Sequence, residues 1–310
     1  MKRIFIDGSA GTTGLRIHER LSDRSDVLLM TLPDEKRKDA KCRAEMLNQA
    51  DIAFLCLPDA AAIEAVGLIE NDKTVVIDTS TAHRTEDGWA YGFPELGTEF
   101  YNKIKTSNRI AVPGCHASGF IALVKPLVES GVLSPDSFIC CNSLTGYSGG
   151  GKKMITEYES EDRGVLLNAP RQYALSQQHK HLKEMKAITG IENFPAFCPI
   201  VADFYSGMEV TIPLFKQQIK KGTTIDKVIE IYKEKYCDSV VYYNGQADPD
   251  GLLSASALSG TDKMEISVFG NDERILLTAR YDNLGKGASG AAVEVMNIVM
   301  DVDKTKGLVL

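Results

Sequence analysis

Short apolar runs alternate with amphipathic segments through the first 80 residues of the chain. Four runs have the length and the branched side chains of buried strands, and they occupy residues 2–7, 27–32, 51–58 and 74–80. The segments between them, residues 12–21, 39–49 and 59–70, are predicted to be helices. Strands that alternate with helices of about ten residues are typical of a parallel sheet covered on both faces. The pattern therefore predicts a Rossmann-type, doubly wound α/β domain.

Beyond residue 115 the chain is richer in strands, and its elements alternate less regularly. The predicted order is helix 120–130, strand 137–148 entering a glycine loop, strand 204–215, helix 224–236, strand 240–243, a hairpin at 264–281 and a helix at 288–302. The turn of the hairpin is expected at residues 270–272, Gly-Asn-Asp, because alternating apolar runs flank it. This part of the chain is predicted to form a second domain of α+β type.

Composition narrows the class of protein. The chain has 310 residues, enough for two domains with separate cores, and its net charge of -7 argues against nucleic-acid or membrane-surface binding. The sequence contains neither the apolar stretch of a signal peptide nor a run of about 18 apolar residues that would span a membrane. Seven cysteines without a CxxC pair fit a reduced cytoplasm and disfavour disulfides or zinc. We therefore expect a cytoplasmic protein that acts on a small molecule.

A glycine-rich turn follows the first predicted strand and runs directly into a helix. It reads G-x-x-G-x-x-G and consists of Gly8, Ser9, Ala10, Gly11, Thr12, Thr13 and Gly14. Glycines at such a turn let the backbone approach a pyrophosphate, which then sits at the positive end of the helix. A plain strand-to-helix turn is the alternative, but the position after the first strand of a βαβ unit favours a dinucleotide site.

The end of the second predicted strand bears on which dinucleotide binds. A carboxylate there would bind the 2′-hydroxyl of NAD, whereas basic residues suit the 2′-phosphate of NADP. No carboxylate closes this strand, and Lys36, Arg37 and Lys38 follow within reach of a loop. We therefore expect NADP as the cofactor, with a solvated helix start carrying charges of both signs as the alternative.

Cys115 stands apart from the other cysteines. It follows Pro113 and Gly114 and precedes small residues that could open a helix. A helix N-terminus lowers the pKa of a thiol and favours the thiolate, which is the nucleophilic form. A cysteine packed in a tight turn would have the same surroundings, so the local sequence favours a nucleophile without deciding it.

Two of the five histidines, His179 and His181, lie close together, and Glu184 follows three residues after His181. On a helix this carboxylate would neighbour the imidazole and orient it. A thiol nucleophile needs an acid or base partner, and these side chains are the candidates; two surface histidines on a basic helix face are the alternative. Histidines two apart on a helix point in different directions, which disfavours a metal site. His18, on the first predicted helix, is expected to be structural.

Arg84 lies just beyond the fourth predicted strand. The carboxyl ends of parallel strands are where ligands bind in such sheets. An arginine there can clamp a carboxylate or a phosphate with two parallel hydrogen bonds. A surface arginine without a ligand is the alternative.

Taken in order along the chain, these segments resemble the N-acetyl-gamma-glutamyl-phosphate reductases, NADPH-dependent enzymes of arginine biosynthesis, and the length is similar to that of the family's shorter type. The matching segments are GSAGTTG, STAHR, YGFPEL, IAVPGC, YSGGGKK, HKHLKE and DNLGKGASGAAVEVMN. The chain departs from the family at His116, where an aromatic side chain is usual, and at Ser118, Leu123 and Lys183. The role of His116 stays open.

The resemblance implies a role for individual residues. Cys115 is expected to be the nucleophile, and His181, with Glu184, is favoured over His179 as the acid or base. The implied cofactor contacts are the glycine turn at residues 8–14 together with Lys36, Arg37, Ser148, Gly149 and Asn283, and the implied substrate contacts are Arg84, Tyr91 and Ser118. No metal is expected.

The resemblance also implies a domain plan and a reaction. Residues 1–114, completed by a C-terminal helix within 286–310, would form the NADP-binding domain, and residues 115–285 the catalytic and oligomerisation domain of a dimer or tetramer. The expected reaction reduces N-acetyl-gamma-glutamyl phosphate to N-acetylglutamate 5-semialdehyde and phosphate through a cysteine thioester. The alternatives are a reductase for aminoadipyl or aspartyl phosphate and a non-catalytic NADP-binding redox sensor.

Overall fold

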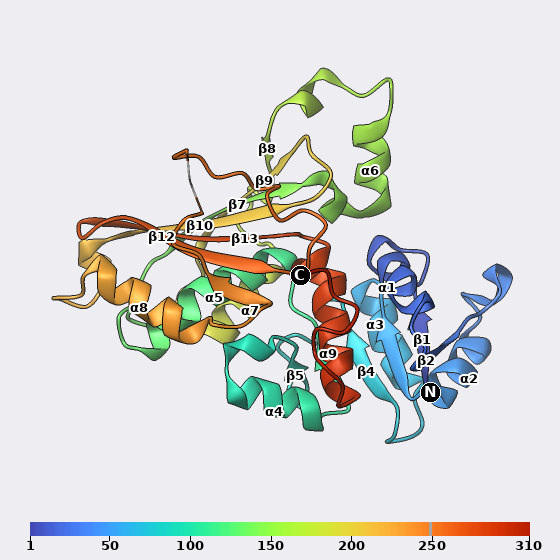
Figure 1. Ribbon diagram of the computed structural model, residues 1–310. Helices are drawn as coiled ribbons and strands as arrows, with labels where there is room; N and C mark the ends of the chain where they lie inside the picture. The colour runs from blue at the N-terminus through green and yellow to red at the C-terminus, as the bar shows by residue number, and fades with distance from the viewer. Residues whose placement is uncertain (248–249) are drawn as a thin grey trace. The chain divides into compact units, whose positions relative to one another are not determined.

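The computed structural model describes residues 1–247 and 250–310, and these form two compact units. Unit 1 comprises Met1–Gly114 and Ala288–Leu308, and unit 2 comprises Cys115–Gly287 with Val309–Leu310. Each unit is built around a sheet of its own (Figure 1). The C-terminal helix belongs to unit 1, as the sequence predicts.

Unit 1 is a parallel sheet with strand order β2-β1-β3-β4-β6-β5. Its elements are β1 Lys2–Asp7, α1 Thr12–Ser22, β2 Val27–Met30, α2 Ala40–Gln49, β3 Ile52–Leu55, α3 Asp59–Gly67, β4 Val75–Asp78, β5 Ala90–Tyr91, α4 Thr98–Thr106, β6 Arg109–Ala111 and α9 Gly290–Val299. Alternate residues of β1 face different cores: Ile4 and Ile6 pack with α1 and α9, and Phe5 packs with α2 and α3. The predicted doubly wound α/β sheet is therefore confirmed.

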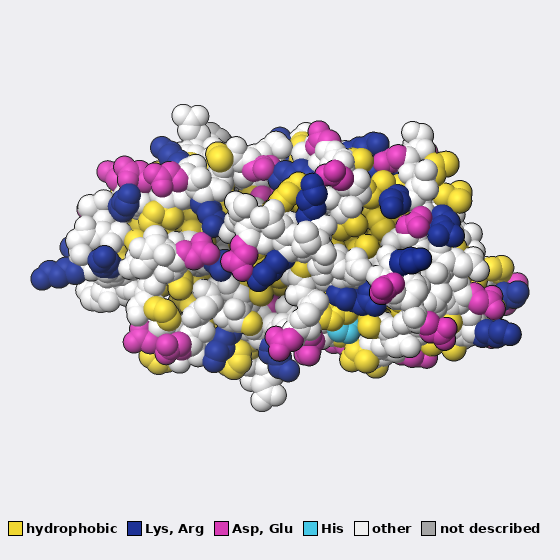
Figure 2. Space-filling view, turned by 90° about the horizontal axis from the view of Figure 1, so that it is seen from below, with side chains coloured by type: hydrophobic (Ala, Val, Ile, Leu, Met, Phe, Trp, Pro, Cys, Tyr) yellow, Lys and Arg dark blue, Asp and Glu magenta, His cyan; other side chains and the backbone are white. Residues whose placement is uncertain are grey.

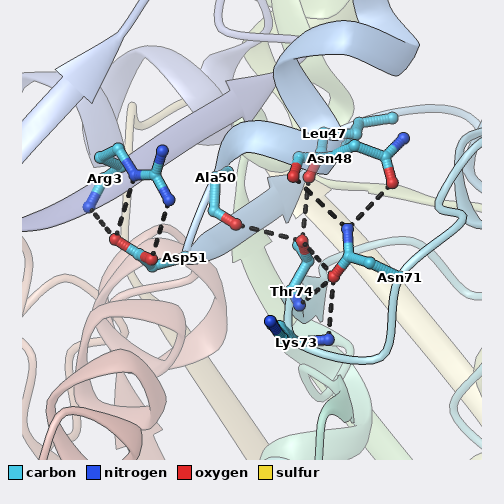
Figure 3. Close-up of polar contacts among 8 residues, drawn as sticks. All are labelled: Arg3, Leu47, Asn48, Ala50, Asp51, Asn71, Lys73 and Thr74. Atoms are coloured by element: carbon cyan, nitrogen blue, oxygen red, sulfur yellow. Dashed lines mark hydrogen bonds and ion pairs between the residues drawn. The ribbon is translucent and has the colours of Figure 1, made fainter.

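Polar side chains tie together the connections that enter β3 and β4 in unit 1 (Figure 3). The Asn71 amide donates to Asn48 Oδ1 at 2.9 Å, and the Thr74 hydroxyl donates to the carbonyls of Leu47 and Ala50, each at 3.1 Å. These contacts satisfy backbone groups that the helix end leaves without partners. They lie where the strands begin, so the opposite edge of the sheet, where the strands end, remains for ligand binding.

Unit 2 is a mixed sheet with strand order β11-β12-β13-β10-β7-β9-β8. Its elements are α5 Cys115–Glu129, β7 Cys140–Gly146, α6 Gly151–Glu159, β8 Arg171–Gln172, α7 His181–Thr189, β9 Ala196–Ala202, β10 Met208–Phe215, α8 Ile225–Lys235, β11 Val241–Tyr243, β12 Met264–Asn271 and β13 Arg274–Tyr281. Helices α5 and α8 pack on strands of this sheet, and α7 packs on α5, so the three helices cover one face (Figure 1). The predicted α+β character of this domain is confirmed.

Two predicted boundaries differ from the structure. The helix expected from residue 120 begins at Cys115, because small residues such as Ala117 and Gly119 continue the helix into the packed interior. The hairpin turn is Asp272 and Glu273, since Asn271 still pairs with Arg274. Gly270 was expected in the turn, but it lies within the paired strand, where it has a φ of +106°.

None of the described helices is both long and apolar enough to cross a membrane. On the face that Figure 2 shows, basic and acidic side chains are interspersed among apolar ones.

Candidate active site

The glycine turn of unit 1 joins β1 to α1, and close backbone packing explains two of its glycines. A Cβ atom on Gly8, which has a φ of +87°, would lie 2.3 Å from the carbonyl oxygen of Cys56. A Cβ on Gly14 would lie 2.5 Å from the Gly8 carbonyl oxygen, whereas one on Gly11 would meet nothing closer than 3.5 Å. Gly11 caps α1 without a side-chain acceptor, so no capping side chain occupies the first N–H groups of this helix. The turn therefore has the form of a pyrophosphate cradle.

A cavity of about 250 Å³ opens beside this turn. Its lining includes Gly8, Ser9 and Ala10, and the basic side chains at its wall are Arg37 and Lys38. Lys36, which the sequence paired with Arg37 as a cofactor contact, is not among the lining residues, and Lys38 takes that place. His18 also lines the cavity, although the sequence indicated a structural role. Its position four residues after Gly14, on the same helix face, was the signal available.

The carboxylate that ends β1 is neutralised within unit 1. Asp7 is buried and accepts a hydrogen bond from Arg43 Nε of α2 at 3.0 Å. Burial raises the pKa of Asp7, and the ion pair with Arg43 opposes that shift. This side chain lines the cavity, but its Oδ2 atom is already engaged by Arg43.

Arg84 is buried in unit 1, so the surface alternative for this residue is wrong. Its guanidinium donates to the backbone carbonyls of Val112 at 2.9 Å and Thr79 at 3.1 Å, which fixes its direction. The neighbouring His83 stacks on Trp89 and contacts Asp78 with its Nδ1 atom at 2.7 Å. Tyr91 is buried in β5.

In unit 2, Cys115 is the first residue of α5. The Tyr281 hydroxyl of β13 donates to the Cys115 carbonyl at 2.6 Å and accepts the Gly119 N–H at 3.0 Å. A Cβ on Gly119 would lie 2.7 Å from that hydroxyl, and one on Gly287 would lie 3.2 Å from the Cys115 Cβ. The small residues around Cys115 therefore make room for Tyr281 and for the thiol itself. Tyr281 is a contact that the sequence did not predict.

The two predicted histidines meet where α7 begins. His181 is its first residue, and the two imidazole centroids lie 4.7 Å apart. The His181 N–H donates to His179 Nδ1 at 3.3 Å, so the proton of a neutral His179 ring is on Nε2. His181 Nε2 lies 4.0 Å from Glu184 Oε1, and both side chains are buried. The alternative of a surface histidine pair is wrong for His181.

His116 joins this histidine cluster. Its ring centroid lies 5.6 Å from that of His181 and 5.9 Å from that of His179. Ser118, two residues further along α5, is buried in the first turn of the helix. Within the part of the chain that the structure describes, no three His, Cys, Asp or Glu side chains are arranged to hold a metal ion.

Three predicted cofactor-side residues of unit 2 lie together. The Asn283 amide donates to Ser148 Oγ at 3.0 Å and accepts the Gly207 N–H at 2.8 Å. A Cβ on Gly149 would lie 3.3 Å from Asn283 Nδ2. Asn283 thus fixes the shape of the glycine loop that follows β7.

Comparison with known proteins identifies the family. The semialdehyde dehydrogenase NAD binding domain matches residues 30–104, and the semialdehyde dehydrogenase dimerisation domain matches residues 115–283. "N-acetyl-gamma-glutamyl-phosphate reductase 2" of a Nostoc species is 44% identical over 99% of this chain and 99% of its own length. The chain belongs to the N-acetyl-gamma-glutamyl-phosphate reductase family.

Other members of the reductase family also match over nearly the full length of the chain. The N-acetyl-gamma-glutamyl-phosphate reductase of Mesorhizobium japonicum is 44% identical, covering 96% of this chain and 98% of its own. That of Burkholderia ambifaria is 42% identical, covering 96% of both. Among solved structures, aspartate semialdehyde dehydrogenase II of Vibrio cholerae superposes with a TM-score of 0.73 at 16% identity, over 97% of this chain and 98% of its own. This chain therefore shares its fold with aspartate semialdehyde dehydrogenase II.

Proposed function

We propose that the protein is a cytoplasmic, NADPH-dependent N-acetyl-gamma-glutamyl-phosphate reductase that forms N-acetylglutamate 5-semialdehyde and phosphate in arginine biosynthesis. The observation that carries this proposal is the placement of Cys115 at the start of α5 in a chain 44% identical to a reductase of that name over nearly its full length. A thiol at a helix N-terminus is a nucleophile suited to an acyl phosphate.

The residues of unit 1 fit NADPH. The backbone of the glycine turn would cradle the pyrophosphate, and Arg37 and Lys38 at the cavity wall would pair with the 2′-phosphate. Ser148, Gly149 and Asn283 of unit 2 are proposed to lie on the nicotinamide side. When bound, NADPH supplies the hydride that reduces the acyl group.

Cys115 carries the acyl group through the first half of the reaction. Its thiolate attacks the acyl carbon, a C–S bond forms, the bond to the phosphate oxygen breaks, and inorganic phosphate leaves. The negative oxygen that develops during attack is stabilised by backbone N–H groups in the first turn of α5, near Ser118. Covalent capture divides one difficult reduction into two easier steps.

His181 moves the proton in the second half. As the thioester is reduced, the charged His181 imidazole donates its proton to the carbonyl oxygen, and the product is a hemithioacetal on Cys115. The imidazole of His181 accepts that hydroxyl proton as the carbonyl reforms and the C–S bond breaks, which returns the thiolate. Glu184, with its Oε1 atom 4.0 Å from His181 Nε2, stabilises the charged ring, and His179 is proposed to contact the substrate. Arg84 and Tyr91 are proposed to bind the α-carboxylate.

The experiment that tests this function runs the reaction in reverse. Purified protein is given N-acetylglutamate semialdehyde, NADP⁺ and phosphate, and NADPH is followed by absorbance. We expect oxidation that requires phosphate and that is faster than with the aminoadipate or aspartate semialdehydes. A preference for either of those would reassign the substrate, and no phosphate-dependent oxidation of any of them would favour a non-catalytic sensor.

We also propose that the protein is a homo-oligomer, either a dimer or a tetramer. Two observations support this: the match of residues 115–283 to a dimerisation domain, and a sheet in unit 2 whose described helices α5 and α8 pack on one face. Sedimentation velocity tests the assembly, and a monomer at micromolar concentration would contradict it.

A further inference from the structure

His116 is buried beside the proposed nucleophile and links two hydroxyl groups. Its Nδ1 atom lies 2.6 Å from Ser143 Oγ of β7, and its Nε2 atom lies 2.5 Å from the Tyr173 hydroxyl. Burial, with a smaller effect from His179, lowers the pKa of His116 from 6.5 to about 3, so the ring is neutral near pH 7. A neutral imidazole carries one N–H, so it donates to one of these hydroxyls and accepts from the other.

The surroundings of Ser143 decide which nitrogen carries the proton. The Ser143 side chain is fully buried, and among the described residues its hydroxyl has His116 as its hydrogen-bond partner. If Nδ1 carried the proton, the buried serine O–H would be left without an acceptor, which is unfavourable in the protein interior. Ser143 therefore donates to Nδ1, and Nε2–H donates to the Tyr173 oxygen. This leaves the Tyr173 proton available for another acceptor.

Tyr173 is held in place at the expense of backbone strain. Its N–H donates to the Pro199 carbonyl at 3.1 Å, directly after β8. Ala174 and Gln177, neither of them glycine, follow with φ of 52° and 56°. Left-handed backbone at residues with a side chain is strained and clusters at functional sites. The Gln177 amide bonds the Phe197 backbone at 2.7 and 2.8 Å, which holds the strained segment against β9.

Cys115, which directly precedes His116 in the chain, is the ionisable group that acts electrostatically on Tyr173. Burial raises the pKa of Tyr173, and a thiolate at Cys115 raises it further, so the phenol keeps its proton. Among the described residues, His179 and His181 are the other titratable side chains in ring contact with His116 or Tyr173, and Tyr281 of β13 interacts with both Cys115 and Glu184. A phenol O–H beside a sulfur anion stabilises that anion by a charge-assisted hydrogen bond.

We propose that His116 is a positioning residue: anchored by Ser143, it orients the Tyr173 hydroxyl so that its proton is donated to the Cys115 thiolate. This inference rests on the proposed role of Cys115 as the nucleophile. It gives a function to His116, whose role the sequence left open.

The thiolate population of Cys115 tests the inference without turnover. The rate of alkylation by iodoacetamide is measured against pH in the apoenzyme, and the Cys115 peptide is followed by mass spectrometry. Tyr173→Phe keeps the ring but removes the proton donor, and we expect the midpoint to rise by about one pH unit, a tenfold loss of thiolate at a given pH. His116→Phe should shift the midpoint by a similar amount. The peptide of exposed Cys237 is the internal control and should not change.

Two further variants separate positioning from packing. The Gln side chain can place an amide near the Nε2 position, so His116→Gln should restore the donor to Tyr173 and a midpoint close to wild type, whereas the shorter His116→Asn should behave like His116→Phe. The double variant His116→Phe/Tyr173→Phe should match Tyr173→Phe alone, because His116 acts through that hydroxyl.

Three results would overturn the inference: an unshifted midpoint in Tyr173→Phe, additive shifts in the double variant, or a Gln variant no better than Phe. If His116→Phe does not fold, Ser143→Ala is the substitute, because it leaves the imidazole in place but removes the hydroxyl that fixes its tautomer. An unshifted midpoint in Ser143→Ala would contradict the proposal equally. The reverse-reaction assay on the wild-type protein stands apart from these measurements, so a wrong substrate assignment and a wrong role for His116 give different failures.

Discussion

The cofactor turn of unit 1 and the thiol site of unit 2 are built in opposite ways. The turn is seven consecutive residues, and its shape follows from backbone contacts such as that of Gly8 with the Cys56 carbonyl. The thiol site is assembled from segments far apart in the chain: Cys115 and its partner Tyr281 are 166 residues apart, and His116 and Tyr173 are 57 apart. Backbone geometry controls the first region, and side-chain hydrogen bonds control the second.

The largest expected effect comes from removing the thiol. Cys115→Ser should lower turnover by about 10⁴-fold or more, because a serine hydroxyl at this position has no comparable population of anion. NADPH affinity, measured by fluorescence titration, should be unchanged, since unit 1 holds the glycine turn. Cys237→Ser, at an exposed cysteine, is the control and should retain full activity. Substantial turnover in Cys115→Ser would contradict the assignment of acyl transfer to the thiol site and of cofactor binding to the glycine turn.

The glycine turn should respond to a single methyl group. Gly8→Ala would force a left-handed φ on alanine and a contact with a carbonyl oxygen, and we expect a loss of about 2 kcal/mol or more in the free energy of unfolding. Gly67→Ala, in α3, meets no atom within 4 Å and should stabilise by up to about 1 kcal/mol. Urea denaturation measures both. Equal effects at the two positions would show that the turn is not fixed by its backbone.

The cavity wall should set the choice of dinucleotide. Arg37→Ala with Lys38→Ala should raise KM for NADPH by about tenfold, the equivalent of one charge-assisted contact, and leave KM for NADH unchanged. Lys36→Ala is the matched control, because this lysine does not line the cavity. Steady-state kinetics with both cofactors decides, and a wild-type preference for NADH would contradict the proposed 2′-phosphate site.

The buried imidazole should make stability depend on pH. The pKa of His116 is lowered from 6.5 to about 3, so below about pH 6.5 the unfolded chain binds a proton that the folded chain does not. Stability is then lost as pH falls, by about 1 kcal/mol between pH 7 and pH 5.5 from this group alone. Urea unfolding of wild type and His116→Gln at both pH values should show this difference, with the variant losing less. Parallel losses would indicate that His116 is protonated in the folded protein.

The contrast between the regions also explains what the sequence could predict. The alternation of apolar runs and helices was sufficient for the order of elements through β4, because strands buried on both faces are apolar throughout. Strands β5 and β6 were missed because they are only two and three residues long. The glycine turn was recognised whole, since each of its residues is adjacent in the chain to the next.

The thiol site could be predicted only in part. Four residues could be recognised as candidates from their residue types, which suit nucleophilic or acid–base chemistry. The structure places all four in one unit: Cys115, His179, His181 and Glu184. Ser143, Tyr173 and Tyr281 are ordinary residues in strands or loops, and their importance comes from partners that only the fold brings close. Lys38 was recognised as part of a basic run. That Lys38 lines the cavity and Lys36 does not depends on the direction of a loop, which the spacing of residues does not define.

The central claim is that Cys115 carries the acyl group of an acyl phosphate. The direct measurement mixes the protein with N-acetyl-gamma-glutamyl phosphate in the absence of NADPH, quenches it with acid, and maps the adduct by mass spectrometry. We predict an N-acetylglutamyl group on the Cys115 peptide, discharged as the semialdehyde when NADPH is added. An unmodified Cys115 in a protein that still turns over, or an acyl group on another residue that NADPH discharges, would contradict the claim.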